Sequence, residues 1–144
     1  MGEIIAAELG RAPPELTQLK ALIAAKKLGR KSGAGFYEWK DGKSVKASVS
    51  GVSVPPDLID RMILMLVNEC VATLREKVVE DADLIDGAVI FGTGFAPFRG
   101  GPLAYARSRG IEDVVARLEE LATRYGPRFR PDPGWALLKP PGKA

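Results

Sequence analysis

The stretch AVIFGTGFAPFRGG, residues 88–101, has the spacing of glycines that comes nearest to a nucleotide-binding motif in this sequence. An apolar run followed by Gly92 and Gly94 could form a strand and a turn that cradles a phosphate. Such a loop needs a small third residue for close helix packing, but Pro97 stands there and has no N–H. Glu112 lies at about the distance of a ribose-binding acid, yet it belongs to an amphipathic segment, and too little chain remains for further strand–helix units. We therefore predict that this stretch is not a dinucleotide-binding loop.

The composition excludes most forms of self-contained catalysis. The 144 residues include no histidine and one cysteine. The commonest general base near neutral pH and the commonest metal ligand are therefore missing. Catalysis by Ser–His–Asp or Cys–His groups is excluded, and a zinc site is nearly so. We expect no catalytic residue and no metal site in this chain.

The same composition indicates in which cellular compartment the protein resides. A lone cysteine cannot form an internal disulfide and is typical of a reducing environment. The N-terminus lacks the apolar region of a secretion signal, and the longest apolar run, residues 62–67, is too short to span a bilayer. We expect a soluble, cytoplasmic protein without a membrane partner.

Positive charge is concentrated between residues 20 and 46, where only Glu38 and Asp41 oppose it. Such a cluster is either solvated surface or a contact for an anionic partner such as a cofactor phosphate. The net charge of +3 is too small to indicate nucleic acid, and no helix carries aligned arginines. The basic residues are Lys20, Lys26, Lys27, Arg30, Lys31, Lys40, Lys43 and Lys46.

Helical periodicity dominates the elements that would position these residues. We expect an all-α protein with one short extended segment, the aromatic GFYEW of residues 35–39, which the turn pair Asp41-Gly42 follows. Residues 44–56 read as a linker, and the proline-rich tail is expected to wrap the surface and dock Trp135. The predicted helices cover residues 3–9, 13–28, 57–79, a segment whose start is marked by the acidic residues Glu80, Asp81 and Asp83, a short one from 102, and 111–125.

The predicted helix 57–79 carries one apolar stripe and one unusual polar residue. Cys70 lies on the stripe, so we interpret it as a small core residue and not as a reactive thiol. Asn68 shares another face with Arg61 and Arg75. An asparagine in so apolar a helix either bonds to a neighbouring backbone group or touches a ligand or partner domain. The predicted stripe consists of Ile59, Ile63, Leu66, Cys70, Leu74 and Val78.

Residues 92–102 are predicted to form a sharp corner between two helices. Gly92 and Gly94 would end the preceding helix by adopting backbone angles that other residues rarely adopt. Phe95 and Phe98 would anchor the turn in the core, and Gly100-Gly101-Pro102 would restart a helix, with Arg99 bonding to carbonyls or a carboxylate.

This corner also carries a family resemblance. DADLIDGAVIFGTGFAPFRGGPLAYARSRG, residues 81–110, resembles the C-terminal helical domain of 3-hydroxyacyl-CoA dehydrogenases, and more narrowly its second copy in the multifunctional α-subunit of fatty-acid β-oxidation. RMILMLVNECVATLREKVVEDADLID, residues 61–86, is similar to the preceding long helix, and KKLGRKSGAGFYEW, residues 26–39, to the closing segment of the first copy. Ala96 departs from the family, which usually has a second proline there.

The resemblance implies a fold and a division of labour. The fold would be a helical domain like the C-terminal domain of 6-phosphogluconate dehydrogenase. Residues 1–50 would be the end of a first such domain together with a linker, and residues 51–144 would form a second domain. A Rossmann domain absent from this chain would bind NAD and supply the catalytic histidine and glutamate. The helical part would cover the acyl-CoA site and build a dimer. Because the Rossmann domain is missing, the chain would be a C-terminal fragment or a separately encoded partner, inactive alone.

Two site residues follow from the resemblance. Lys31, before the SGAGFY turn, corresponds to a lysine that reaches bound NAD, and a lysine beside a glycine turn suits an anionic cofactor. Asn68 stands where the catalytic copy has a substrate-facing asparagine, although Glu69 replaces the arginine that follows it in the family. The alternative hypothesis is a helical dimerisation or docking module with no ligand contact, which would expose apolar faces.

Overall fold

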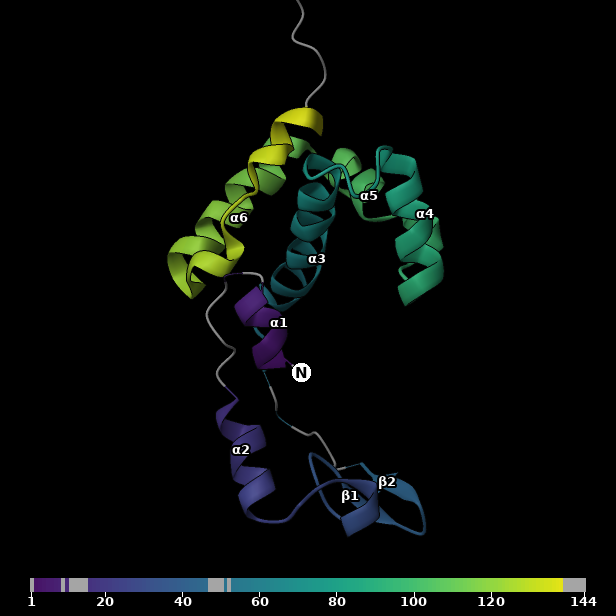
Figure 1. Ribbon diagram of the computed structural model, residues 1–144, viewed down its shortest axis with the longest axis vertical. Coiled ribbons are helices and arrows are strands. Elements are labelled where there is room, and N and C mark those ends of the chain that lie inside the picture. The colour runs from purple at the N-terminus through teal and green to yellow at the C-terminus, as the bar shows by residue number, and fades with distance from the viewer. Residues whose placement is uncertain (1, 9, 11–15, 47–50, 52, 139–144) are drawn as a thin grey trace, which may run out of the picture. The chain divides into compact units, whose positions relative to one another are not determined.

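The computed structural model describes residues 2–8, 10, 16–46, 51 and 53–138. The chain divides into two compact units, Met1–Val52 and Ser53–Ala144. The described residues form helices and one short hairpin, so the predicted all-α class with one extended segment is confirmed (Figure 1). That the first unit is the end of a preceding helical domain stays a prediction.

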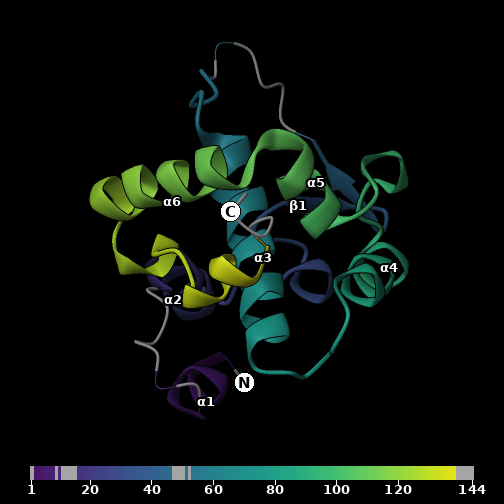
Figure 2. The same ribbon diagram turned by 90° about the horizontal axis from the view of Figure 1, so that it is seen from above.

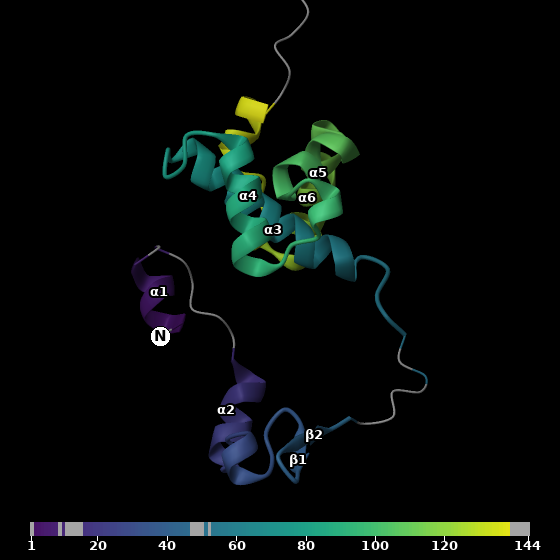
Figure 3. The same cartoon turned by 90° about the vertical axis from the view of Figure 1, so that its right-hand side faces the viewer.

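The described residues of the first unit form two short α-helices, the 3₁₀ turn Arg30–Ser32 and the hairpin (Figure 3). The turn at Asp41 and Gly42 has positive φ angles of 52° and 74°, as hairpins with this pair require. Trp39 pairs with Ser44 across the two strands, which confirms the extended aromatic segment but corrects the linker, whose first residues are strand. The elements are α1 (Gly2–Glu8), α2 (Thr17–Ala24), β1 (Glu38–Lys40) and β2 (Lys43–Val45).

The second unit is built around its longest helix, α3. Figure 2 shows α3 with α6 and the C-terminal segment on one side and α4 on the other, and α3 contacts all of them as well as α5. No described helix is long and apolar enough to cross a membrane. The helices are α3 (Leu58–Arg75), α4 (Ala82–Thr93), α5 (Pro102–Arg109) and α6 (Ile111–Tyr125), with short 3₁₀ turns at Pro97–Arg99, Pro127–Phe129 and Pro133–Leu138.

Two helices end earlier than predicted, and for the same physical reason. Helix α2 stops at Ala24 and α3 at Arg75, not at residues 28 and 79. Lys26 and Lys77 each have a φ of 56°, and the backbone N–H groups there and one residue later bond back across the last turn. This is the Schellman termination that glycine usually provides. Because lysine occupies the left-handed position, the sequence gives no stop signal at either end.

The hydrophobic core lies between α3, α5, α6 and the C-terminal segment, and Ile85 of α4 joins it. The predicted stripe on α3 is wrong at its ends, since Ile59 and Val78 are 70% and 71% exposed. The prediction for Cys70 is confirmed by its burial, and the docking of Trp135 is confirmed by an exposed fraction of 3%. The α3 residues that enter the core are Leu64, Val67, Cys70 and Val71, which meet Val114, Leu118 and Leu121 of α6 together with Phe129, Trp135 and Leu138.

The corner between α4 and α5 depends on one buried carboxylate. Asp86 is 4% exposed, and its two oxygens accept hydrogen bonds from the N–H groups of Leu103 (2.6 Å) and Ala104 (2.9 Å). These N–H groups belong to the first turn of α5 and have no partner within that helix. Gly101 makes the approach possible, because its φ is +110° and a Cβ there would overlap the Asp86 side chain. Asp86 therefore caps α5 from the neighbouring helix.

Other details of the predicted corner need correction. Phe98 is 84% exposed and does not anchor the turn, although Phe95 is half-buried. Gly94 ends α4 with a φ of 75°, whereas Gly92 lies inside the helix without a positive φ. Arg99 lies over the ring of Phe98, 5.6 Å from its centroid, a contact that the sequence did not indicate.

Asp86→Ala should lower the free energy of unfolding by about 3 kcal/mol, because two buried N–H groups lose a charged acceptor. Asp83→Ala, an exposed carboxylate in the first turn of the same helix, is the matched control and should change it by less than about 0.5 kcal/mol. Denaturant unfolding of the two variants measures the difference. Equal effects would contradict the capping role of Asp86.

Candidate functional site

Lys31, the predicted cofactor contact, lies at the tip of a tight loop in the first unit. The loop contains one 3₁₀ turn, Arg30–Ser32, and is closed by a hydrogen bond from the Gly29 N–H to the Ala34 carbonyl (2.7 Å). The Ser32 hydroxyl accepts a bond from the Leu28 N–H (2.8 Å) inside the loop. Lys31 itself is exposed.

Glycines make this loop compact. A Cβ on Gly35 would lie 2.7 Å from the Gly29 Cα, so the two backbone segments touch where the loop closes. Arg30, the residue before Lys31, lies against the hairpin turn, where a Cβ on Gly42 would be 3.1 Å from its guanidinium. The loop thus holds Arg30 against the hairpin and leaves Lys31 at the surface, where an anionic group could reach it.

Asn68, the predicted substrate contact, holds the C-terminal segment against α3. Its carbonyl oxygen accepts hydrogen bonds from the Asp132 N–H (2.9 Å) and the Trp135 indole N–H (2.8 Å). Its amide nitrogen donates to the Arg130 carbonyl (3.0 Å). The backbone-bonding alternative for Asn68 is therefore the one the geometry shows, and a substrate contact stays a prediction that would require the segment to move.

Arg75 lies two turns after Asn68 on the same face of α3 and binds the same segment. Its guanidinium forms two parallel hydrogen bonds to the Asp132 carboxylate, at 2.8 and 3.0 Å. These bonds hold the pKa of Asp132 below its ordinary value, and the Gly134 N–H adds a third bond to the same carboxylate. Residues 130–135 thus pack on the polar face of α3 that the spacing of Asn68 and Arg75 predicted.

Two further carboxylates at the beginning of α3 are locked in ion pairs that the sequence analysis missed. Asp60 accepts bonds from Arg109 (2.6 Å) and Arg117 (2.8 Å), and the Arg109 bond first of all lowers its pKa. Asp57, 3% exposed, has its pKa lowered chiefly by the Tyr125 hydroxyl, 2.6 Å away. Both stay ionised near neutral pH, so they are poor proton donors there and serve to tie α3 to α5 and α6.

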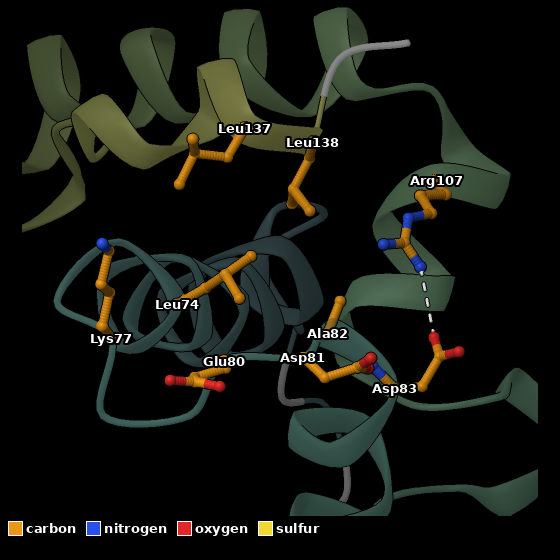
Figure 4. A pocket seen from close by; sticks show the side chains of 9 residues that line it. All are labelled: Leu74, Lys77, Glu80, Asp81, Ala82, Asp83, Arg107, Leu137 and Leu138. Atoms are coloured by element: carbon orange, nitrogen blue, oxygen red, sulfur yellow. Dashed lines mark hydrogen bonds and ion pairs between the residues drawn. The ribbon is translucent and has the colours of Figure 1, made fainter.

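A surface pocket of about 610 Å³ lies where α3, α4 and the C-terminal segment meet (Figure 4). Leu137 and Leu138 face Leu74 across it, and Arg107 pairs with Asp83 at 3.7 Å on its rim. Three carboxylates against two cations disfavour a polyanion such as a dinucleotide or coenzyme A. Neither Lys31 nor Asn68 lines the pocket; its charged residues are Lys77, Glu80, Asp81, Asp83 and Arg107.

Asn68→Ala should lower the free energy of unfolding by about 2–3 kcal/mol, since it leaves the N–H groups of Asp132 and Trp135 without their acceptor. In a Trp39→Phe background, the emission of Trp135 should shift to the red as its indole meets water. Thr73→Ala on the same helix, whose hydroxyl donates to the Glu69 carbonyl, is the control. Unchanged stability and emission in Asn68→Ala would contradict the clamp.

The Asp60 ion pairs predict a defined dependence of stability on pH. The folded-state pKa lies below the ordinary value of 3.8, so the stabilisation is complete above that pH and is lost as the pH falls through the folded-state pKa. The difference in unfolding free energy between the wild type and Asp60→Asn should therefore shrink below about pH 4. Glu119→Gln, on the exposed side of α6, serves as the control in acid titrations of stability. A difference that stays constant over the whole range would be inconsistent with this account.

Comparison with known proteins identifies a sequence similarity. No protein-family model matches the chain. It is 34% identical over 149 residues to the fatty acid oxidation complex subunit alpha of Idiomarina loihiensis. The match covers 94% of this chain and 20% of that subunit, so the chain spans about a fifth of that relative's length. The chain is therefore related to a part of the fatty acid oxidation complex α-subunit, which confirms the resemblance recognised in its sequence.

Proposed function

We propose that the chain is the helical part of an NAD-dependent 3-hydroxyacyl-CoA dehydrogenase of fatty-acid oxidation. The observation that carries this proposal is the similarity over 94% of the chain to a fatty acid oxidation complex α-subunit. The chain has no histidine, so a catalytic histidine must come from a Rossmann domain supplied by another segment or subunit. The chain alone is inactive in this proposal and acts in the cytoplasm, where a lone thiol stays reduced.

Lys31 is the residue through which this chain would contact NAD. It is exposed at the tip of a loop whose backbone is closed by the Gly29–Ala34 hydrogen bond, so its position is fixed while its ammonium group remains accessible. An ammonium group can pair with a cofactor phosphate without the bidentate geometry that arginine needs. The Rossmann domain would supply the remaining contacts to the dinucleotide.

The helical domain would act on the substrate by covering it. Acyl-CoA contact at Asn68 would require release of residues 130–135, because both functional atoms of the amide are engaged by that segment. We therefore expect Asn68 to act by holding the C-terminal segment on α3 while the helical domain covers the substrate.

The test is calorimetric titration of the folded chain with NADH and, separately, with acetoacetyl-CoA. Lys31→Ala should weaken NADH binding by about tenfold, the effect of one charge-assisted bond. Lys43→Ala on β2 removes the same charge from the same unit and is the matched control. The titrations are repeated with the Rossmann domain of the related subunit added in trans, and dehydrogenase activity of the mixture is measured.

The second candidate function is a docking or dimerisation module without ligand contact. Large apolar side chains at the surface of the second unit favour it, above all Phe91 and Phe98, which are 92% and 84% exposed. Absence of NADH and acyl-CoA binding by a cooperatively folded sample, with no activity in trans, would sink the dehydrogenase proposal and leave this one.

A further inference from the structure

Two lysines face each other across the end of the hairpin in the first unit. Lys40 of β1 and Lys43 of β2 are direct partners in the register of the strands, and both are exposed. The Cβ atoms of such partners lie about 5 Å apart on the same face of the strands, and like charges at these positions destabilise a hairpin. An anion between the two ammonium groups would turn this repulsion into two attractive contacts.

Arg30 brings a third cation to the same turn. A Cβ on Gly42, the residue before Lys43, would lie 3.1 Å from the Arg30 Nη2 atom and 3.8 Å from its Nε atom, so the guanidinium lies against the turn. The loop that carries Arg30 is held to β1 by a hydrogen bond from the Trp39 N–H to the Gly33 carbonyl (2.9 Å). Backbone contacts therefore place Arg30 beside the lysines, and a ligand need not order the loop.

These three cations have no ion-pair partner among the residues that the structure describes. Residues 30–46 as a whole carry five cations and two carboxylates, all of them exposed. The surplus of positive charge contrasts with the pocket of the second unit, where three carboxylates accompany two cations. The hairpin turn, and not the pocket, therefore attracts an anionic group.

We propose that Arg30, Lys40 and Lys43 bind the phosphate monoester of a nucleotide, the group that coenzyme A carries on a 3′ oxygen and NADPH on a 2′ oxygen. A phosphate monoester has close to two negative charges near neutral pH and three acceptor oxygens on one phosphorus atom. The Arg30 guanidinium takes two of these oxygens in its planar fork, and the two ammonium groups act on the third as point charges. The pyrophosphate of NADH spreads its charge over two phosphorus atoms and matches the three cations less well.

This site is separate from the NAD contact proposed at Lys31, and only the choice of coenzyme A as a probe rests on the proposed function. NADH has no phosphate monoester, so Lys43→Ala should leave NADH binding unchanged. The same variant should weaken the binding of coenzyme A. Lys31→Ala and Lys43→Ala therefore test the two proposals independently.

Calorimetric titration of the full chain with coenzyme A and with dephospho-coenzyme A, in a buffer free of phosphate, measures the contribution of the 3′-phosphate. Coenzyme A should bind at least about tenfold more tightly, the effect of one or more charge-assisted hydrogen bonds. Lys43→Ala should reduce this ratio by at least about threefold, and so should Arg30→Lys, which keeps the charge but loses the planar fork. Lys20→Ala removes the same charge from α2 and is the matched control, which should leave the ratio unchanged.

Titrations with NADPH and NADH identify the source of the phosphate. A preference for coenzyme A over its dephospho form alone assigns the site to the acyl-CoA substrate, and a preference for NADPH over NADH alone assigns it to a dinucleotide. Either preference supports a phosphate-monoester site at the hairpin, provided that Lys43→Ala reduces it.

Two results would overturn the proposal. One is equal affinity for both members of each ligand pair, and the other is a preference that Lys20→Ala reduces as much as Lys43→Ala does, because general attraction by the positive charge of the unit would then explain it. Circular dichroism of every variant separates loss of binding from loss of folding. A chain that prefers coenzyme A to its dephospho form, but neither binds NADH nor is active in trans, would support the hairpin site and contradict only the dehydrogenase proposal.

Discussion

The buried carboxylate of Asp86 is the constraint on which the second unit depends. It supplies the N-terminal cap of α5 from another helix, and it can do so because Gly101 has no side chain to keep the two helices apart. The same contact fixes the rotation of α4 about its own axis. Once Asp86 must face α5, Leu84 and Phe91 must face away from it, so the cap inside the unit decides which side chains of α4 are exposed.

The C-terminal segment is the second element that the core requires. Trp135 is buried in the core that α3 and α6 share, but its indole N–H needs an acceptor, and Asn68 of α3 provides one. Arg75 and Asp132 add a paired charge at the edge of this contact. The half-buried asparagine therefore allows the tryptophan to be buried with its N–H bonded, which gives Asn68 a structural role at this position.

The proposed division of labour follows from what each unit offers chemically. In the second unit, hydrogen bonds from Tyr125, Arg109 and Arg75 lower the pKa values of Asp57, Asp60 and Asp132, so these three carboxylates are committed to structure. The first unit has a compact glycine loop with an exposed ammonium group at Lys31.

The sequence by itself determined the helices whose signals are local. The acidic N-terminus of α4, the limits of α6 and the Asp41-Gly42 turn all depend on neighbouring residues, and all were predictable. Only the tertiary structure decided the rest. The buried stripe, displaced by one position, and the partners of Asp60 and Asn68 depend on contacts between residues far apart in the chain. The ends of α2 and α3 depend on local hydrogen bonds of the last turn, but the lysines at their left-handed positions give no sequence signal for them. Local periodicity shows that a helix has a buried side, but the packing partner decides which residues lie on it.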